Sequence, residues 1–526
     1  MVVASFSLRE NYWEEFELQE EDIEFIYSHL LEVETPLTSE ELVGVLVEER
    51  IRREIAAVEA QRLAGGEIYL PKEHYEKGQK LVFPALSWQQ GEVVGTRQGW
   101  NPDFGNFEVI QVEFQNHETR EFAAGFEDHE LNVPPEAGLD GSPDAKDILA
   151  SSGDFLVKRL EDDLITNPDF VRIAGRWFPR ALLIDINTGH LNLAEAVLDM
   201  SGGGPLPTST LLEQVDLSGE ENQKLVEFSM DLALQEDKRF DEVGPAGEVL
   251  WYLKRLEPEG VRETPLYLHY GEIDYDRGLL SDEMLALERI LDDELSPIDY
   301  EDVDGDDVVV RLLYPHLRAG TLPLTHRVRP FFPTAYEAPR IRFMLVDSDT
   351  KEKFPGWVVL ERGYVFGLED WYRERELMPG SIIRVRRGSK AGEVIIKAET
   401  QRSRRDWVRT VLVGTDGGMV FAMLKQVVTA AYDERLAIMV PDLDALDNVW
   451  ELRKQKQPPF ERTLVDIVRE LTKLNPQGHV HASELYAAVN LVRRCPPGPI
   501  MALLASRPWF VHVGDLHFRF DDSAGN

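Results

Sequence analysis

The sequence predicts a multidomain α+β protein in which repeated winged-helix units are interspersed with small β-barrels. Its 526 residues, 43% of them hydrophobic, suffice to bury several cores. Three segments align without gaps, and each combines a turn, an apolar strand residue, a capping hydroxyl and an amphipathic helix: TPLTSEELVGVL (35–46), GPLPTSTLLEQV (204–215) and GHVHASELYAAV (478–489). Between them lie short runs of β-branched and aromatic residues, spaced as in small β-barrels.

Charge and cysteine content narrow the class of protein. The net charge is −39, so the surface as a whole repels nucleic acid and anionic membranes. Cys495 is the single cysteine, which precludes an internal disulfide framework and a cysteine-built zinc site. The sequence contains no run of about 18 apolar residues, and acidic residues occur near the N-terminus before a cleavable apolar segment could form. We therefore expect a soluble, cytoplasmic protein with no membrane partner.

The first 135 residues are expected to form two units. Residues 1–75 form a winged-helix-like unit whose wing is the hairpin GGEIYLP (65–71). Residues 76–135 form an SH3-like β-barrel, with strands in KGQKLVFP, GEVVGTRQG, FEVIQVEF and TREFAAGF.

The next 200 residues are expected to form three parts. Residues 136–190 are a helical segment with a hairpin, PDFVRIAGRWFP, which resembles a wing but lacks a clear upstream strand and second helix. Residues 191–260 are a second winged-helix-like unit with the wing KRFDEVGPAGEVLWYL. Residues 261–332 are an acidic connecting region, because residues 262–310 contain 16 acidic and 3 basic residues.

Residues 333–410 are expected to form a basic β-barrel. Residues 340–409 contain 16 basic and 11 acidic residues, so this segment has a net positive charge although the chain as a whole is negative. The strands PRIRFMLVD, FPGWVVLERGYVFGL, SIIRVRRGSK and GEVIIKAETQ, with a short helix at EDWYRER, loosely resemble a B3-type DNA-binding pseudobarrel. Clustered arginines with interleaved aromatic rings suit phosphate and base contacts. The predicted nucleic-acid-binding residues are Arg384, Arg386, Arg387, Lys390, Arg402, Arg404, Arg405, Trp371 and Tyr372. The alternative is that these arginines pair with the protein's own acidic surface.

Residues 411–457 are expected to be a helical connector, and residues 458–526 a third winged helix. Its short strand and second helix, GHVHASELYAAVN, and its wing, PWFVHVGDLHFRF, resemble the HARE-type winged helix, as in the RNA polymerase delta subunit. The resemblance implies association with transcription or DNA-processing machinery, with RNA polymerase or another DNA-associated protein as partner. The third helix, PGPIMALLAS, has no basic residue, which favours protein contacts over DNA contacts. We expect this unit to fold as an isolated fragment.

The sequence thus predicts a non-enzymatic, transcription- or DNA-associated adaptor, whose winged helices dock protein partners and whose basic barrel contacts nucleic acid. The sequence has no phosphate-binding P-loop, dinucleotide-binding glycine pattern, zinc-protease motif or nucleophile elbow. We therefore expect no catalytic residue, cofactor or metal. Two alternatives remain open: a metal-dependent enzyme of the nuclease class, with Glu361, Glu369 and Asp370 as candidate carboxylates, and an acidic DNA mimic.

Overall fold

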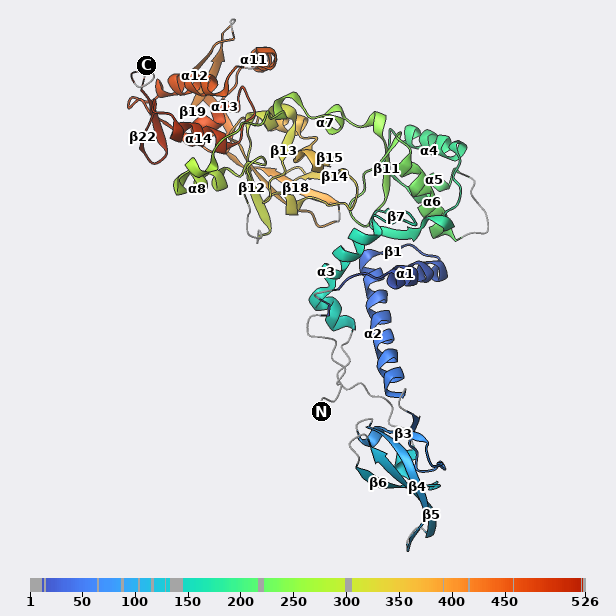
Figure 1. Cartoon of the computed structure of the whole chain (residues 1–526). Coiled ribbons are helices and arrows are strands. Elements are labelled where there is room, and N and C mark those ends of the chain that lie inside the picture. The colour runs from blue at the N-terminus through green and yellow to red at the C-terminus, as the bar shows by residue number, and fades with distance from the viewer. Residues whose placement is uncertain are drawn as a thin grey trace. The chain divides into compact units, whose positions relative to one another are not determined.

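The computed structural model is a multidomain α+β fold with several separate sheets, as the sequence predicts (Figure 1). It describes residues 12–13, 16–63, 66–86, 89–102, 105–114, 118–127, 129–132, 145–215, 222–298, 305–390, 392–414, 417–456, 458–521 and 523. The chain divides into two compact units, residues 1–172 with 176–183 and residues 173–175 with 184–526. Among the described helices, none has both the length and the apolar composition to cross a bilayer.

The first compact unit contains three helices and a three-stranded sheet, built from segments far apart in sequence. The elements are α1 (Glu20–Val33), β1 (Leu37–Thr38), α2 (Ser39–Leu63), α3 (Ala145–Leu164), β7 (Phe170–Ile173), β8 (Arg176–Pro179) and the 3-10 turn η3 (Arg180–Leu182). Strand β8 is central, between β1 and β7. The unassigned hairpin at residues 168–179 therefore belongs with β1, which corrects the predicted unit boundary at residue 75. We call these elements the N-terminal helix–hairpin unit.

A five-stranded barrel-like sheet is inserted between α2 and α3. Its elements are β2 (Glu67–Ile68), β3 (Lys80–Phe83), η1 (Pro84–Leu86), β4 (Gln89–Asn101), β5 (Gly105–Phe114), β6 (Thr119–Ala124) and η2 (Glu130–Asn132), with strand order β2-β3-β4-β5-β6. The segment 65–71, predicted as a wing, instead contributes β2, which runs parallel to β3. The reason is packing: the buried Tyr69 ring stacks on Phe83 at 4.7 Å, and its hydroxyl donates to the Ala123 carbonyl at 2.5 Å.

The second compact unit begins with a helix–hairpin unit of the same element order. Its elements are α4 (Thr188–Met200), β9 (Leu206–Pro207), α5 (Thr208–Leu212), α6 (Gln223–Glu236), β10 (Phe240–Glu242) and β11 (Leu250–Leu253). Strand β11 is central, between β9 and β10. The strand, helix and hairpin expected within residues 191–260 are all present in this central helix–hairpin unit.

The chain ends in a third unit of this kind, the C-terminal helix–hairpin unit. Its elements are α12 (Phe460–Thr472), β21 (Val480–His481), α13 (Ala482–Val489), α14 (Pro497–Ser506), β22 (Phe510–Gly514) and β23 (His517–Phe520). Strand β23 is central, between β21 and β22. In all three units the apolar residue of the short first strand lies opposite an aromatic residue of the last strand: Leu37 and Trp177, Leu206 and Trp251, Val480 and Phe518.

A group of hydrogen-bonded polar side chains accompanies that aromatic residue in two of the three units. The indole of Trp177 donates to the Ser39 hydroxyl at 3.0 Å, and this hydroxyl donates to Glu161 at 2.6 Å. In the central unit Trp251, Thr208 and Asp231 form the same arrangement. The C-terminal unit has Phe518, Ala482 and Met501 at the corresponding sequence offsets, all buried and apolar. The three hydrogen-bonded side chains are thus present or absent together, because a single polar atom without a hydrogen-bond partner would be costly in a core.

A seven-stranded sheet lies between the last two helix–hairpin units in sequence. The elements from residue 254 onward are η4 (Lys254–Leu256), α7 (Glu259–Arg262), η5 (Leu266–Leu268), η6 (Arg277–Leu279), α8 (Asp282–Leu291), β12 (Asp307–Arg311), α9 (Tyr314–Ala319), β13 (Thr321–Pro323), η7 (Arg329–Phe331), β14 (Arg340–Asp347), β15 (Lys353–Val359), η8 (Leu360–Arg362), β16 (Tyr364–Phe366), α10 (Glu369–Glu374), β17 (Ile382–Arg387) and β18 (Glu393–Ala398). The strand order is β12-β17-β18-β14-β15-β16-β13, with β14 and β18 parallel. The region 261–332, predicted to be an acidic connector, therefore supplies both edge strands. Val308 and Val310 explain β12: they alternate along the strand and are buried in the core of the sheet.

A separate two-stranded ribbon follows, formed by β19 (Thr400–Val413) and β20 (Met419–Ala430), and helix α11 (Leu443–Lys456) comes after it (Figure 1). This differs from the predicted boundary at residue 410 and from the predicted helical connector at 411–457, whose first half is strand. One end of the ribbon packs into the C-terminal core through Val411 and Phe421.

The C-terminal helix–hairpin unit shares its core with preceding elements. Leu287 of α8, Phe421 of β20 and Trp450 of α11 belong to the same buried cluster as Leu464 of α12. The expectation that residues 458–526 fold alone does not fit this packing, because the isolated fragment would expose the surfaces that these elements cover.

Candidate interaction surfaces

The predicted nucleic-acid-binding cations lie on two different elements. Arg384, Arg386 and Arg387 are on β17, with Lys390 in the turn to β18. The remaining three, Arg402, Arg404 and Arg405, are on β19, which belongs to the ribbon and not to the seven-stranded sheet.

Three of these cations are engaged within the protein. Arg384 donates to Asp307 at 2.9 Å and to Glu399 at 2.8 Å, and the hydrogen bond from Arg384 is the first cause of the lowered pKa of Glu399. Arg404 pairs with Asp406 at 2.8 Å. Arg387 donates to the Pro330 carbonyl at 2.9 and 3.1 Å. For these residues, the alternative of internal pairing describes the structure better than a free binding surface.

The other four cations are exposed and form no side-chain hydrogen bond or ion pair with the residues that the structure describes: Arg386, Lys390, Arg402 and Arg405. Their positive charge is therefore not cancelled locally. Within this set, only Arg405 lies on the same strand face as a neighbouring exposed aromatic ring, that of Trp407.

The structure corrects the predicted stacking role of Trp371 and Tyr372. Trp371 is 5% exposed, and its indole donates to Asp347 at 2.5 Å. Tyr372 is buried, and its hydroxyl donates to the Thr321 carbonyl at 2.8 Å. Both rings of α10 therefore belong to the core of the seven-stranded sheet, where no base can stack on them.

The ribbon carries an aromatic residue that the sequence prediction missed. Trp407 is 57% exposed, lies opposite Lys425 in the register, and has the Lys425 ammonium 5.3 Å from its ring centre. Arg405 and Val427 form the next pair on the same face, because residues two apart in a strand share a face. We call Arg405, Trp407, Lys425 and Val427 the ribbon face. The alternation of Arg405, Trp407 and Arg409 was the available signal, but it becomes visible only when residues 400–413 are recognised as one strand.

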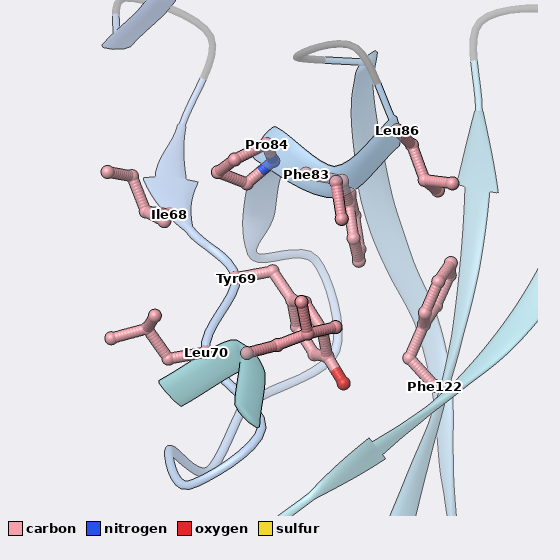
Figure 2. A pocket seen from close by; sticks show the side chains of 9 residues that line it. Ile68, Tyr69, Leu70, Phe83, Pro84, Leu86 and Phe122 are labelled. Carbon is pink, nitrogen blue, oxygen red and sulfur yellow. The ribbon is translucent and has the colours of Figure 1, made fainter. Parts of the chain in front are cut away.

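The inserted barrel has a small apolar pocket, shown in Figure 2. Its volume is about 120 Å³, and its walls are Ile68, Tyr69, Leu70, Phe83, Pro84, Ala85, Leu86, Phe122 and Leu131. The rings of Phe83 and Phe122 lie 4.4 Å apart and form one wall, while Leu131 is 41% exposed. Glu67 adjoins this pocket in the sequence, and residues 66–132 contain 12 acidic and 5 basic residues.

The carboxylates proposed for the enzyme alternative are not gathered into one site. Glu361, Glu369 and Asp370 are exposed, and Asp370 pairs with Arg373. Asp370 also lines a cleft of about 570 Å³. In the described ranges, no group of three or more histidine, cysteine or acidic side chains is arranged to hold a metal ion.

Comparison with known proteins gives no relative: no protein-family model, no curated protein and no solved structure matches this chain. The interpretation of its surfaces therefore depends on their own chemistry.

Proposed function

We propose that this protein is a non-enzymatic adaptor that joins a protein partner to single-stranded nucleic acid, as part of transcription or DNA processing in the cytoplasm. The observation that carries the proposal is the ribbon face, where the exposed Trp407 lies between the cations Lys425 and Arg405. An aromatic ring flanked by cations binds single strands because a base stacks on the ring while the cations attract phosphates.

The nucleic-acid contact is local, because the rest of the chain opposes it. A protein with a net charge of −39 repels a polyanion at long range, so binding depends on cations that lack an acidic partner. On the ribbon these are Arg402, Arg405 and Lys425. Arg384, by contrast, is already neutralised by two carboxylates and contributes little.

The protein-binding side of the proposal is the apolar pocket of the inserted barrel. Its volume suits one aliphatic side chain of a partner, and the acidic excess of the barrel favours basic residues around that side chain. The proposed occupant is a leucine flanked by lysine or arginine in a segment of RNA polymerase or of another DNA-associated protein. Leu131 stands at the edge of the pocket and is exposed, so Leu131→Lys blocks it without disturbing the barrel core.

The nucleic-acid contact is tested by the binding of a labelled 20-nucleotide oligo(dT) to the full chain at low salt, followed by fluorescence anisotropy. Trp407→Ala should weaken binding by about 1–3 kcal/mol, or about 5- to 150-fold, which is the usual range for one stacked base. The matched control is Trp100→Ala, which removes a tryptophan that is 70% exposed on the barrel hairpin. Absence of binding at low salt, or equal effects of the two substitutions, would contradict the proposal.

The pocket is tested by calorimetry with a short peptide that has one leucine among lysines. This peptide should bind at least tenfold more tightly than a peptide with serine in place of the leucine, or one with glutamates in place of the lysines. Leu131→Lys should abolish the difference. Oligonucleotide cleavage with Mg²⁺ or Mn²⁺ that Asp370→Asn abolishes would instead favour the nuclease alternative. Failure of the intact chain to bind any oligonucleotide, together with competition against DNA for a DNA-binding protein, would favour the DNA mimic.

A further inference from the structure

A second cation-lined site lies in the C-terminal part of the chain. It is a cavity of about 600 Å³ between the segment after η5, helix α11, the start of α12 and the segment that precedes α14. The volume is in the usual range for sites that bind small organic molecules. None of its lining residues belongs to β19 or β20.

The lining has four basic residues and no acidic one: His269, Arg453, Lys454 and Arg493. This is unusual for a chain with 95 acidic and 56 Lys and Arg residues. Neither arginine nor the lysine forms an ion pair with a carboxylate of the described residues. Their positive charge is therefore available to a ligand.

The two arginines are held by neutral groups. Arg453 donates to the Thr463 hydroxyl at 3.0 Å, and Arg493 donates to the Pro458 carbonyl at 3.4 Å. Burial lowers the pKa of Arg453; the nearby charge of Asp466 opposes this effect, and the positive charge of Arg493 adds to it. Two guanidinium groups that repel each other in a partly desolvated cavity favour an anion between them.

The same cavity offers an aromatic wall. Phe460, half-buried at the start of α12, has the Arg493 guanidinium 5.5 Å from its ring centre. Trp450 is held in place because its indole donates to the Leu491 carbonyl at 2.7 Å. A flat apolar surface beside a group of cations suits a ligand that is itself planar at one end and anionic at the other.

We propose that this cavity binds a nucleoside phosphate, with the phosphate at Arg453, Lys454 and Arg493 and the base against Phe460. The shared chemistry is a phosphate monoester on a nucleoside, which a free nucleotide and the 5′ end of a nucleic-acid strand both supply. This site is independent of the proposed ribbon contact, since it uses different residues.

Calorimetry on the full chain with 5′-AMP, adenosine and inorganic phosphate tests the assignment. AMP should bind with a Kd below about 1 mM, and adenosine and inorganic phosphate should each bind at least tenfold more weakly, because each lacks one half of the ligand. Lys454→Gln should weaken AMP binding several-fold, and Lys454→Gln with Arg493→Gln at least tenfold. Lys454 is exposed and forms no side-chain hydrogen bond or ion pair with a described residue, so we expect its variant to keep the fold.

The matched control is Lys456→Gln, which removes an exposed lysine on the same last turn of α11 that does not line the cavity. It should leave the AMP affinity within twofold. No heat with 5 mM AMP, equal binding of adenosine or of inorganic phosphate, or a double variant that binds like the parent would overturn the proposal.

The source of the phosphate is resolved with 5′-phosphorylated and 5′-hydroxyl oligo(dT), measured in the Trp407→Ala background so that the ribbon contributes little. A preference for the phosphorylated strand that the Lys454 and Arg493 substitutions remove supports a strand end as the ligand. Equal binding of both strands, with AMP still bound, supports a free nucleotide. Because Trp407 does not line the cavity, Trp407→Ala should leave AMP binding unchanged even if it abolishes oligonucleotide binding.

Discussion

Replacing Asp293 with alanine should destabilise the C-terminal helix–hairpin unit far more than the loss of a surface ion pair. The Arg494 guanidinium is fully buried and donates to Asp293 at 2.8 and 2.6 Å. It also pairs with Glu294 at 2.7 Å, and the Tyr486 hydroxyl donates to Asp293. These contacts join the segment after α8 to α13 and the residues that precede α14.

The magnitude follows from what the substitution removes. Two hydrogen bonds to charged groups contribute about 1.5–3 kcal/mol each, and Tyr486 would lose its acceptor in the core. Glu294 remains as a counter-ion for Arg494, so the buried charge is not left wholly unpaired. Removal of one partner from a buried ion pair typically costs about 3–5 kcal/mol, and we expect about 4 kcal/mol here.

Hydrogen exchange measured by mass spectrometry on the full chain is the appropriate assay, because a multidomain chain does not unfold in one step. The slowest amides of α13 and α14 should exchange about a thousandfold faster in the Asp293→Ala variant, which corresponds to about 4 kcal/mol of opening free energy. Amides of the inserted barrel should not change.

The control is Glu461→Gln, which removes the partly exposed ion pair between Glu461 and Arg507, 3.2 Å apart. Such pairs contribute about 0–1 kcal/mol. If Asp293→Ala accelerates exchange no more than this control does, the buried cluster is not what holds the C-terminal unit in place, and the reasoning fails.

Three further predictions concern the helix–hairpin units. Burial raises the pKa of Asp231 to about 7, so between about pH 4 and 7 the carboxyl group is protonated in the folded state and ionised in the unfolded state. The stability of the central unit should therefore fall as pH rises from about 4 through 7. Thermal melts of Asp231→Asn should lack this pH dependence. An isolated fragment of residues 458–526 should show less helix by circular dichroism than α12, α13 and α14 contribute in the full chain, since it lacks the core residues of α8, β20 and α11. Trp251→Phe should lower the free energy of unfolding by about 1–2 kcal/mol, and the added substitutions Thr208→Ala and Asp231→Met should recover most of it in denaturant titrations, because the triple variant reproduces the apolar set of the C-terminal unit.

Local patterns were sufficient to predict most elements but not their pairing. Strands β3 to β6 of the inserted barrel and β14 to β18 of the seven-stranded sheet lie where alternating apolar residues and turn residues predicted strands, whereas β12 and β13 lie in the region predicted to be a connector. The partner of β1 is 138 residues or more away, however, and no local periodicity identifies it. The segment at 65–71 had the composition of a wing, and the hairpin at 168–179 had no visible upstream strand, because the barrel separates the two halves of the N-terminal unit.

Burial was the harder property to predict for the candidate site. Trp371 and Tyr372 lie in a segment of charged residues, EDWYRER, that has the composition of an exposed helix. They are buried because α10 packs both rings against the core of the sheet. Arg494 likewise has no acidic neighbour in sequence, and its partner Asp293 lies in the region predicted to be a connector. Long-range partners of this kind decide whether an arginine is free or neutralised.

The distribution of paired and unpaired cations explains how so acidic a protein can still bind an anion. Beyond about 10 Å at 0.1 M salt, charges are largely screened, so the general repulsion by the −39 chain weakens as salt rises, while short contacts persist longer. At the ribbon, added salt has two opposed effects: it weakens the attraction of Arg402, Arg405 and Lys425 for phosphate and reduces the repulsion from the surrounding carboxylates. The stacking of a base on Trp407 is not ionic and changes little. The salt dependence of oligonucleotide binding should therefore be shallower than three phosphate contacts alone would give, and a slope at or above that value would assign the affinity to cations elsewhere on the chain.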